Sequence, residues 1–501
     1  MNRELKNVTK QSGIVFVGKL IGLVITFLFN LIVARLLGAE VFGEFTYLYT
    51  FISFFPIIAL LGIQQGLVYY IPKLSEEKEH KIKREFITIS YLIVSISSIL
   101  LVVIIIVNSE LISKHLLNDS NLSTTLRLIA PMIILLTLVQ LSQGVFRGIK
   151  EIKPFIINQN LIVPSFKVIF FIVAVSIISY NINSIILSFY LSIGIGVIYL
   201  LYYIYSSLLF GKFAFNSIIL YKKVLIYSLP LLLTGFLGFI SQKTDIFMIG
   251  YYLNNENVGI YRVALQIGTI SSFVLVAFNM IFAPTISSLF NRGDMNKLSY
   301  MFKTITKWVV TINLIAFGLI VLNSAEIMSV FGEEFVSGNV ALILISIGQV
   351  VNVGVGSSGY MLIMTGFPKY EMYNNFLTVS INVILNLILI PKYGIEGAAI
   401  ASLASVSIAN ITRLLMVYKI HEIHPYSKDY LKIFSVITLS YLMCVFLKQI
   451  INFNIYIDLI LYTMLFTILS GSILYILGVS KEDKQLIHMF IRKIKKSSNN
   501  G

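Results

Sequence analysis

Long apolar runs, separated by short polar segments, follow one another along the whole chain. A helix that crosses a bilayer needs about 17–25 mostly apolar residues. Runs of this length predict fourteen membrane-spanning helices, which lie near 12–37, 41–71, 86–109, 125–147, 155–180, 184–210, 224–252, 257–290, 299–323, 335–365, 370–391, 395–420, 429–450 and 455–478. The longest of them, such as 257–290, exceed a straight crossing, so we expect them to be tilted, broken or extended past the bilayer. The pattern therefore predicts an all-α integral membrane protein.

The overall composition supports this prediction. Of the 501 residues, 57% are apolar and 12% are charged, and the mean hydropathy is +0.88. Soluble domains are about 45–50% apolar and about 25% charged, so this chain could not cover its surface with polar groups in water. The single cysteine, Cys444, excludes an internal disulfide, and the five histidines form no HExxH pattern. We therefore expect no metal site, and the absence of a GxxxxGK[ST] motif gives no reason to expect a nucleotide or another cofactor.

The basic residues of the short loops gather on one side of the predicted membrane. If the N-terminus is placed in the cytoplasm, Lys and Arg concentrate in both tails and in every second loop, whereas the opposite loops hold only Lys114, Lys392 and Lys448. Cytoplasmic loops of membrane proteins carry such an excess of Lys and Arg. We therefore expect an even number of spans in the cytoplasmic membrane, with both termini in the cytoplasm. The net charge of +15 then gives no reason to expect a nucleic-acid partner.

A weak internal repeat relates the two halves of the chain. A shift of 216 residues pairs Leu37 with Leu253, Glu40 with Glu256, Gly43 with Gly259 and Phe45 with Tyr261. Six helices separate the copies, so the repeat is parallel, an arrangement found in transporters that consist of two lobes. We expect an N-terminal lobe of helices one to six (1–215), a C-terminal lobe of helices seven to twelve (216–425), two extra C-terminal helices (426–480) and a basic tail (481–501).

Two segments resemble a known family. The first hairpin of polysaccharide flippases is similar to ARLLGAEVFGEF at 34–45, and the turn between their helices eleven and twelve is similar to IPKYGIEGAAIAS at 390–402. These flippases form the polysaccharide-transporter (Wzx-like) branch of the multidrug/oligosaccharidyl-lipid/polysaccharide (MOP) exporter superfamily. The resemblance covers essentially the whole chain. In physical terms, the GAAIA run allows helices to approach closely, and Pro391 and Gly394 suit the tight turn before it.

The resemblance implies a MATE-like fold and a flippase, not an enzyme, that moves polyprenyl-pyrophosphate-linked oligosaccharide by alternating access. Three alternatives stay open: a flippase for a peptidoglycan precursor (lipid II type), a multidrug or cation antiporter of the same superfamily, and a membrane-embedded glycan polymerase or ligase. The predominantly basic spans favour an anionic cargo over a cationic drug. The longest outer loop, near 109–124, holds no cluster of catalytic residues, which disfavours the polymerase or ligase.

Ionisable residues at membrane depth are costly and usually face a cavity or a charged partner. The residues that we expect to line a cavity and contact the cargo are Lys19, Lys167, Lys243, Arg262 and Gln64. Asp245 is the clearest acidic residue inside a span. We expect it either to form an ion pair with Arg262 in the next helix or to couple transport to protons or cations. Snorkelling to the interface is expected for the basic residues near helix ends, namely Arg127, Lys303, Lys307 and Lys432.

The basic tail has an amphipathic pattern. Apolar residues follow helical spacing at Ile487, Phe490, Ile491 and Ile494, with Lys and Arg around them. A helix of this kind lies on an anionic membrane surface. The expected partners are therefore lipid-linked oligosaccharide and anionic membrane lipids, with glycan polymerase machinery as a further candidate and no nucleic acid.

Overall fold

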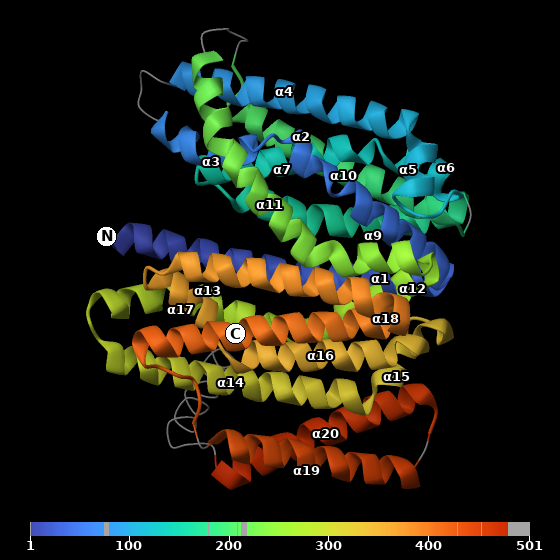
Figure 1. Cartoon of the computed structure of the whole chain (residues 1–501), viewed down its shortest axis with the longest axis vertical. Helices are drawn as coiled ribbons and strands as arrows, with labels where there is room; N and C mark the ends of the chain where they lie inside the picture. The colour runs from blue at the N-terminus through green and yellow to red at the C-terminus, as the bar shows by residue number, and fades with distance from the viewer. Residues whose placement is uncertain are drawn as a thin grey trace, which may run out of the picture. The chain divides into compact units, whose positions relative to one another are not determined.

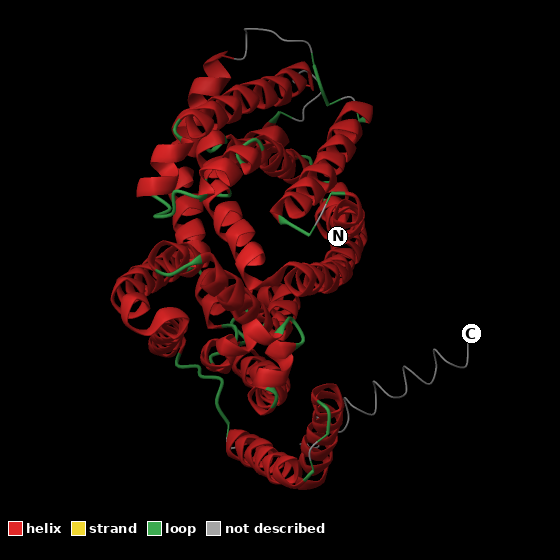
Figure 2. Ribbon diagram, turned by 90° about the vertical axis from the view of Figure 1, so that its right-hand side faces the viewer, coloured by secondary structure: helices red, strands yellow, loops and turns green. Residues whose placement is uncertain are grey.

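The protein is all-helical in this computed structural model, as Figure 2 shows. The structure describes residues 2–74, 80–178, 180–207, 209–211, 218–427, 429–451 and 453–478, and no strand occurs among them. Ten of the described helices are long and apolar enough to cross a membrane, or eleven if the bent pair α6 (Leu122–Ile129) and α7 (Met132–Gly148) forms one span. The all-α, multi-pass membrane fold is confirmed, whereas the count of fourteen spans stays a prediction.

The helices group into two compact units, whose elements are labelled in Figure 1. Unit 1 comprises Met1–Gln266, Met328–Ala341 and Asn375–Ser405, and unit 2 comprises Ile267–Ile327, Leu342–Asn374 and Val406–Gly501. Besides α6 and α7, unit 1 holds α1 (Asn2–Ile52), α2 (Phe55–Ala59), α3 (Ile63–Lys73), α4 (His80–Val107), α5 (Ser109–His115), α8 (Lys153–Ile157), the π-helical turn η2 (Asn158–Ile162), α9 (Val163–Ile177), α10 (Ile182–Ser206), α11 (Ile218–Tyr252) and the 3₁₀ turn η4 (Glu333–Gly338).

Unit 2 holds α13 (Phe273–Asn291), α14 (Met295–Leu322), α17 (Ser358–Met364), α19 (Asp429–Ile450) and α20 (Ile455–Gly478). Residues of both units occur in α12 (Asn255–Ile270), α15 (Ser324–Ser329), α16 (Asn339–Gly354) and α18 (Pro368–His421). The units are groups of contacting residues and do not coincide with the lobes 1–215 and 216–425, which stay a prediction about the repeat. The predicted amphipathic tail lies outside the described residues.

Two of the predicted turns are kinks at glycines, each of which separates two helical arms. Helix α1 breaks at Gly38 (φ 80°, ψ 174°), and α18 breaks at Gly394 (φ 59°, ψ −137°). Glycine adopts a positive φ without the steric cost that a Cβ imposes. At the first break, the carboxylate of Glu334 accepts a hydrogen bond of 2.6 Å from the backbone N–H of Ala39. Both turn positions agree with the sequence, and each lies between two predicted spans.

The second predicted span, 41–71, is divided into shorter helices. It consists of the end of α1, the short α2 with Pro56 in its first turn, and α3. Leu61 (φ 49°) and Gly62 (φ 74°) both have a left-handed conformation between α2 and α3. A Cβ on Gly62 would lie 2.5 Å from the carbonyl oxygen of Ser228, so the backbone of α11 passes very close to this break. The apolar pattern runs across the break and therefore gave no sign of it.

The outer face of α4 shows why this fold needs a bilayer. Its apolar side chains at helical spacing are largely exposed: Leu100 (58%), Val103 (52%), Ile104 (55%) and Val107 (74%). Residues at i, i+3, i+4 and i+7 form one continuous stripe along a helix. Such a stripe is stable against lipid chains, whereas in water it would promote aggregation.

Candidate functional site

Unit 1 contains a cavity of about 500 Å³ beside the break between α2 and α3. Its polar wall consists of Ser53, Gln64, Gln65, Gln140, Gln242 and Lys243. Apolar side chains, among them Ile57 and Phe239, complete the lining. Small-molecule sites commonly measure about 300–1,000 Å³ and combine apolar walls with a few placed polar groups. The structure thus brings two of the expected cavity residues, Gln64 and Lys243, into one cavity of suitable size.

The glutamines of this cavity differ in their hydrogen bonding. The amide nitrogen of Gln64 donates a 2.9 Å hydrogen bond to the amide oxygen of Gln143 on α7. Within the described part of the chain, the amides of Gln65, Gln140 and Gln242 have no hydrogen-bond partner. None of the three is among the fully buried polar groups, since the side chains of Gln65 and Gln140 are half-buried and that of Gln242 is exposed. These three amides are therefore available to a ligand or to water in the cavity.

Three of the expected basic residues form an electrostatic cluster in unit 1, which we call the cation cluster. Arg262 on α12 lies within electrostatic range of both Lys167 on α9 and Lys243 on α11. The ammonium group of Lys167 lies 3.8 Å from the ring centroid of Phe189 and 5.5 Å from that of Phe29. Aromatic faces attract cations, so these rings offset part of the cost of holding Lys167 inside the protein.

Carboxylates do not neutralise the cation cluster. Among the described residues, no ion pair joins Lys167, Lys243 or Arg262 to an acidic side chain, and all three side chains are half-buried. Cations at membrane depth normally pair with an anion or a carbonyl group. The positive charge of the cluster is therefore available to bind an anionic ligand. Lys19, the fifth expected cavity residue, has an exposed side chain on α1, and no described contact brings it to the cluster.

The expected ion pair between Asp245 and Arg262 is wrong. The carboxylate of Asp245 accepts hydrogen bonds from four neutral donors instead: Tyr261 Oη at 2.8 Å, Asn382 Nδ2 at 3.1 Å, Asn386 Nδ2 at 2.7 Å and Ser402 Oγ. Tyr261 precedes Arg262 in α12, and successive side chains on a helix point in directions about 100° apart. The tyrosine therefore faces the carboxylate while the arginine faces elsewhere. This leaves the other expectation for Asp245, ion coupling, as a proposal.

Two of the four basic residues assigned to helix ends, Arg127 and Lys307, have carboxylate partners. Arg127 donates hydrogen bonds to Glu110 (2.7 Å) and Ser109 (2.6 Å), so it is held locally rather than extended freely to the interface. The ammonium of Lys307 lies 3.7 Å from the carboxylate of Asp429. Both pairs lie within their own unit and are partly solvent-accessible, and pairs of this kind are structural.

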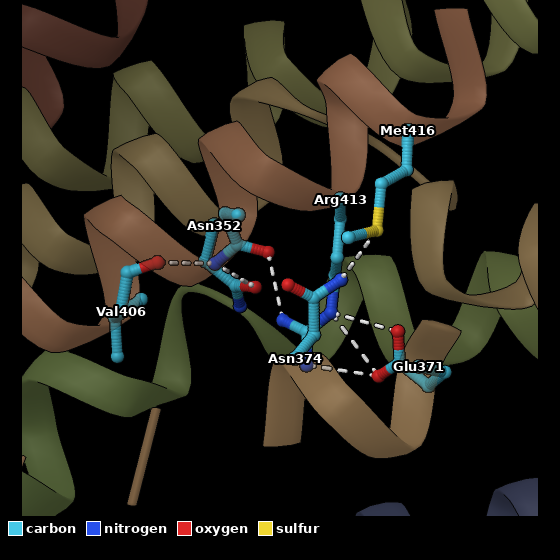
Figure 3. A network of polar contacts seen from close by, with 7 residues as sticks. Asn352, Glu371, Asn374, Val406, Arg413 and Met416 are labelled. Carbon is cyan, nitrogen blue, oxygen red and sulfur yellow. Dashed lines mark hydrogen bonds and ion pairs between the residues drawn. The ribbon is translucent and has the colours of Figure 1, made fainter. Parts of the chain in front are cut away.

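Unit 2 contains a partly buried polar network that the sequence pattern did not predict. Figure 3 shows Arg413 reaching Glu371, with guanidinium-to-carboxylate distances between 2.8 and 3.1 Å and side-chain exposures of 16% and 14%. Arg413 also donates to Asn410 Oδ1 (3.1 Å), whose amide nitrogen donates to Asn352 Oδ1 (3.2 Å). Glu371 lies in the first turn of α18 and Arg413 near its end. A separation of 42 residues gives no signal in the sequence alone.

A relative from Haloferax volcanii, named Probable low-salt glycan biosynthesis flippase Agl15, is 28% identical over 169 residues, which is 33% of this chain and 35% of the relative. The chain spans about a third of the length of this relative and of a second one from the same organism, named Probable flippase AglR. Two solved structures share the fold. The lipid II flippase MurJ in an inward closed conformation has a TM-score of 0.69 at 18% identity, covering 92% of this chain and 98% of MurJ.

The second solved structure is an inward-facing multidrug resistance MATE family transporter of the MOP superfamily. Its TM-score is 0.65 at 13% identity, and the match covers 79% of this chain and 94% of the transporter. Identities this low establish the fold alone, and both structures agree with the MATE-like fold that the sequence predicts. The family model described as Polysaccharide biosynthesis protein matches residues 8–290, more than half of the chain. The chain therefore belongs to the polysaccharide biosynthesis protein family.

Proposed function

We propose that this protein is a flippase that moves polyprenyl-pyrophosphate-linked oligosaccharide across the cytoplasmic membrane, with both termini in the cytoplasm. The observation that carries the proposal is the cation cluster of Lys167, Lys243 and Arg262, which has no carboxylate partner in the described chain. A pyrophosphate supplies the missing negative charge. Charge-assisted hydrogen bonds to phosphate are shorter and stronger than neutral ones, and they strengthen further where water is excluded.

The comparisons support transport rather than enzymatic catalysis. The family model concerns polysaccharide biosynthesis, and the relative from H. volcanii is named a flippase. A multidrug or cation antiporter is the weaker proposal, because the described residues that line the cavity beside the cation cluster include no Asp or Glu that would attract a cationic drug. A lipid II type cargo carries the same pyrophosphate and would suit the same cluster, so it is the second candidate.

The mechanism that we propose is alternating access by the two halves of the parallel repeat. The headgroup binds at the cation cluster, while the polyprenyl chain stays in the bilayer. No residue need react with the cargo, since translocation neither forms nor breaks a covalent bond. Asp245 is the residue that we propose for coupling to a proton or cation, because its described partners are neutral and its carboxylate is therefore not committed to an internal cation.

Reconstitution of the full chain into proteoliposomes tests the function. Fluorescent polyprenyl-pyrophosphate oligosaccharide, lipid II and a cationic dye are offered in parallel, with imposed proton or sodium gradients. We expect the oligosaccharide carrier to become accessible to external lectin at a rate well above that of protein-free vesicles. Transport of the dye alone would overturn the proposal in favour of the antiporter, and movement of lipid II alone would establish the second candidate.

A further inference from the structure

The polar lining of the cavity beside the cation cluster combines several amides with one cation. The side-chain amides of Gln65, Gln140 and Gln242 have no described hydrogen-bond partner, whereas that of Gln64 donates a hydrogen bond to Gln143. We call these four cavity-lining amides the amide wall. The other polar lining residues are Ser53 and Lys243. Lys243 therefore belongs both to the cavity lining and to the cation cluster. All of these residues lie in unit 1.

The amide wall is poorly matched to a phosphate. Each glutamine offers two N–H donors and one carbonyl acceptor. A fully ionised phosphate only accepts hydrogen bonds, so it would leave the carbonyl oxygens of the amides without partners. A hydrocarbon chain would leave every amide group unpaired, at a cost for each buried polar group. Neither the phosphates nor the hydrocarbon chain of a lipid pyrophosphate can therefore supply hydrogen-bond partners for both the N–H groups and the carbonyl oxygens of these amides.

Sugar hydroxyls are well matched to it. A hydroxyl both donates and accepts, so each one can satisfy a donor and an acceptor of the same amide. The apolar part of the lining, including Ile57, Leu60 and Phe239, offers surfaces for the C–H faces of a sugar ring. A site that combines apolar walls with a few placed polar groups fixes the orientation of its ligand.

We infer that this cavity is a saccharide subsite. Gln65, Gln140 and Gln242 bind hydroxyls of the sugar that follows the pyrophosphate, and Lys243 binds the adjoining phosphate. The inference rests on the proposed flippase function and adds to it the direction in which the headgroup lies, with phosphate at the cation cluster and sugar at the amides. It also assigns recognition of the first sugar to residues outside the cation cluster.

Binding to the full-length protein in detergent micelles tests the subsite. The probes share one polyprenyl chain: bare polyprenyl pyrophosphate, and polyprenyl pyrophosphate that carries glucose, galactose or N-acetylglucosamine. Gln65→Leu and Gln140→Leu keep the approximate size of the side chain and remove its hydrogen bonds. Gln449→Leu is the matched control, because Gln449 is exposed on α19 in unit 2 and does not line the cavity.

We expect the wild-type protein to bind at least one sugar-bearing probe about tenfold more tightly than the bare pyrophosphate, and each cavity variant to lose about three- to tenfold of that preference. Affinity for the bare probe should stay unchanged in both variants, which also shows that they are folded. Lys243→Gln should weaken the binding of every probe, and Gln449→Leu should weaken none.

Failure of the subsite can be told apart from failure of the function. If the bare and sugar-bearing probes bind the wild type but both glutamine variants keep the full sugar preference, the saccharide subsite is wrong and the flippase proposal stands. If the wild type binds none of the probes, the proposed function fails and the subsite fails with it. Equal binding of all probes by the wild type also overturns the subsite.

Discussion

Gly43 and Gly259, which occupy equivalent positions in the two copies of the repeat, lie back to back in unit 1. A Cβ on Gly43 would stand 2.8 Å from the backbone nitrogen of Gly259 and would overlap the carbonyl oxygen of Asn255. A Cβ on Gly259 would in turn overlap the carbonyl oxygen of Ala39. The second arm of α1 and the start of α12 therefore meet backbone to backbone. The short repeated motif marks the place where its own two copies pack together.

Substitution of either glycine should destabilise the protein. Gly43→Ala places a methyl group against backbone atoms that cannot move aside, and overpacking typically costs about 1–3 kcal/mol. We expect a lower thermal unfolding midpoint in detergent and a smaller yield of monodisperse protein. Gly194→Ala is the control: Gly194 lies inside α10 with nothing within 4 Å of its Cβ position, so alanine should be neutral or slightly stabilising. Equal effects of the two substitutions would contradict the close packing.

The four donors around Asp245 predict a specific pattern of coupling. A hydrogen bond to a charged group contributes about 1.5–3 kcal/mol, so Tyr261→Phe and Asp245→Asn should each destabilise the protein, and their combination should cost clearly less than the sum. Asp245→Asn and Arg262→Gln should be additive, because these side chains do not touch. Double-mutant cycles on the free energy of unfolding measure both terms. Strong coupling between Asp245 and Arg262 would instead indicate an ion pair between them and would contradict the hydrogen-bonding pattern of the structure.

The partly buried ion pair Arg413–Glu371 should contribute far more to the stability of the protein than the exposed ion pair Arg127–Glu110. Removing one partner of a buried pair typically costs about 3–5 kcal/mol, because the other charge is left without compensation. Glu371→Gln should therefore destabilise the protein strongly, and Glu371→Gln combined with Arg413→Met should be milder than Glu371→Gln alone. Glu110→Gln is the control, because Glu110 is 79% exposed in its ion pair with Arg127 and such pairs contribute about 0–1 kcal/mol.

A similar loss of thermal stability in Glu371→Gln and Glu110→Gln would show that burial does not decide the strength of these two pairs. Thermal unfolding in detergent provides the comparison.

Much of the fold could be predicted from the sequence, because a bilayer forces each span to satisfy its own backbone hydrogen bonds. Apolar run length therefore located the helices, and Gly38 and Gly394 located two turns. The break between α2 and α3 escaped prediction. It depends on the left-handed conformations of Leu61 and Gly62 and on the close passage of Ser228, which are tertiary features.

The site was predicted in its chemistry more than in its geometry. Charge at membrane depth drew attention to Lys167, Lys243 and Arg262, because such residues are costly unless they face a partner. It could not show that Asp245 meets the neighbour of Arg262 rather than Arg262 itself. One residue along a helix changes the direction of a side chain by about 100°. The depth of a residue in the membrane does not show in which direction its side chain points.

The cation cluster gives the most direct test of the cargo. If Lys167 and Lys243 meet a pyrophosphate, each makes a charge-assisted contact that a neutral residue cannot replace, with a contribution of about 1.5–3 kcal/mol, or about one to two orders of magnitude in affinity. Lys167→Gln and Lys243→Gln should therefore reduce flipping about tenfold or more while membrane expression stays near normal. Lys243→Arg should retain part of the activity, since it keeps the charge.

Two further substitutions make this measurement specific. Lys303→Gln, in α14 of unit 2, alters a lysine that we assign to the membrane interface and should be nearly silent. Lys19→Gln alters an exposed side chain without a described contact to the cluster, so we expect a smaller loss than for Lys243→Gln. All variants are compared in one proteoliposome assay at equal protein content. Wild-type flipping by both Lys167→Gln and Lys243→Gln would show that these two lysines do not hold the pyrophosphate.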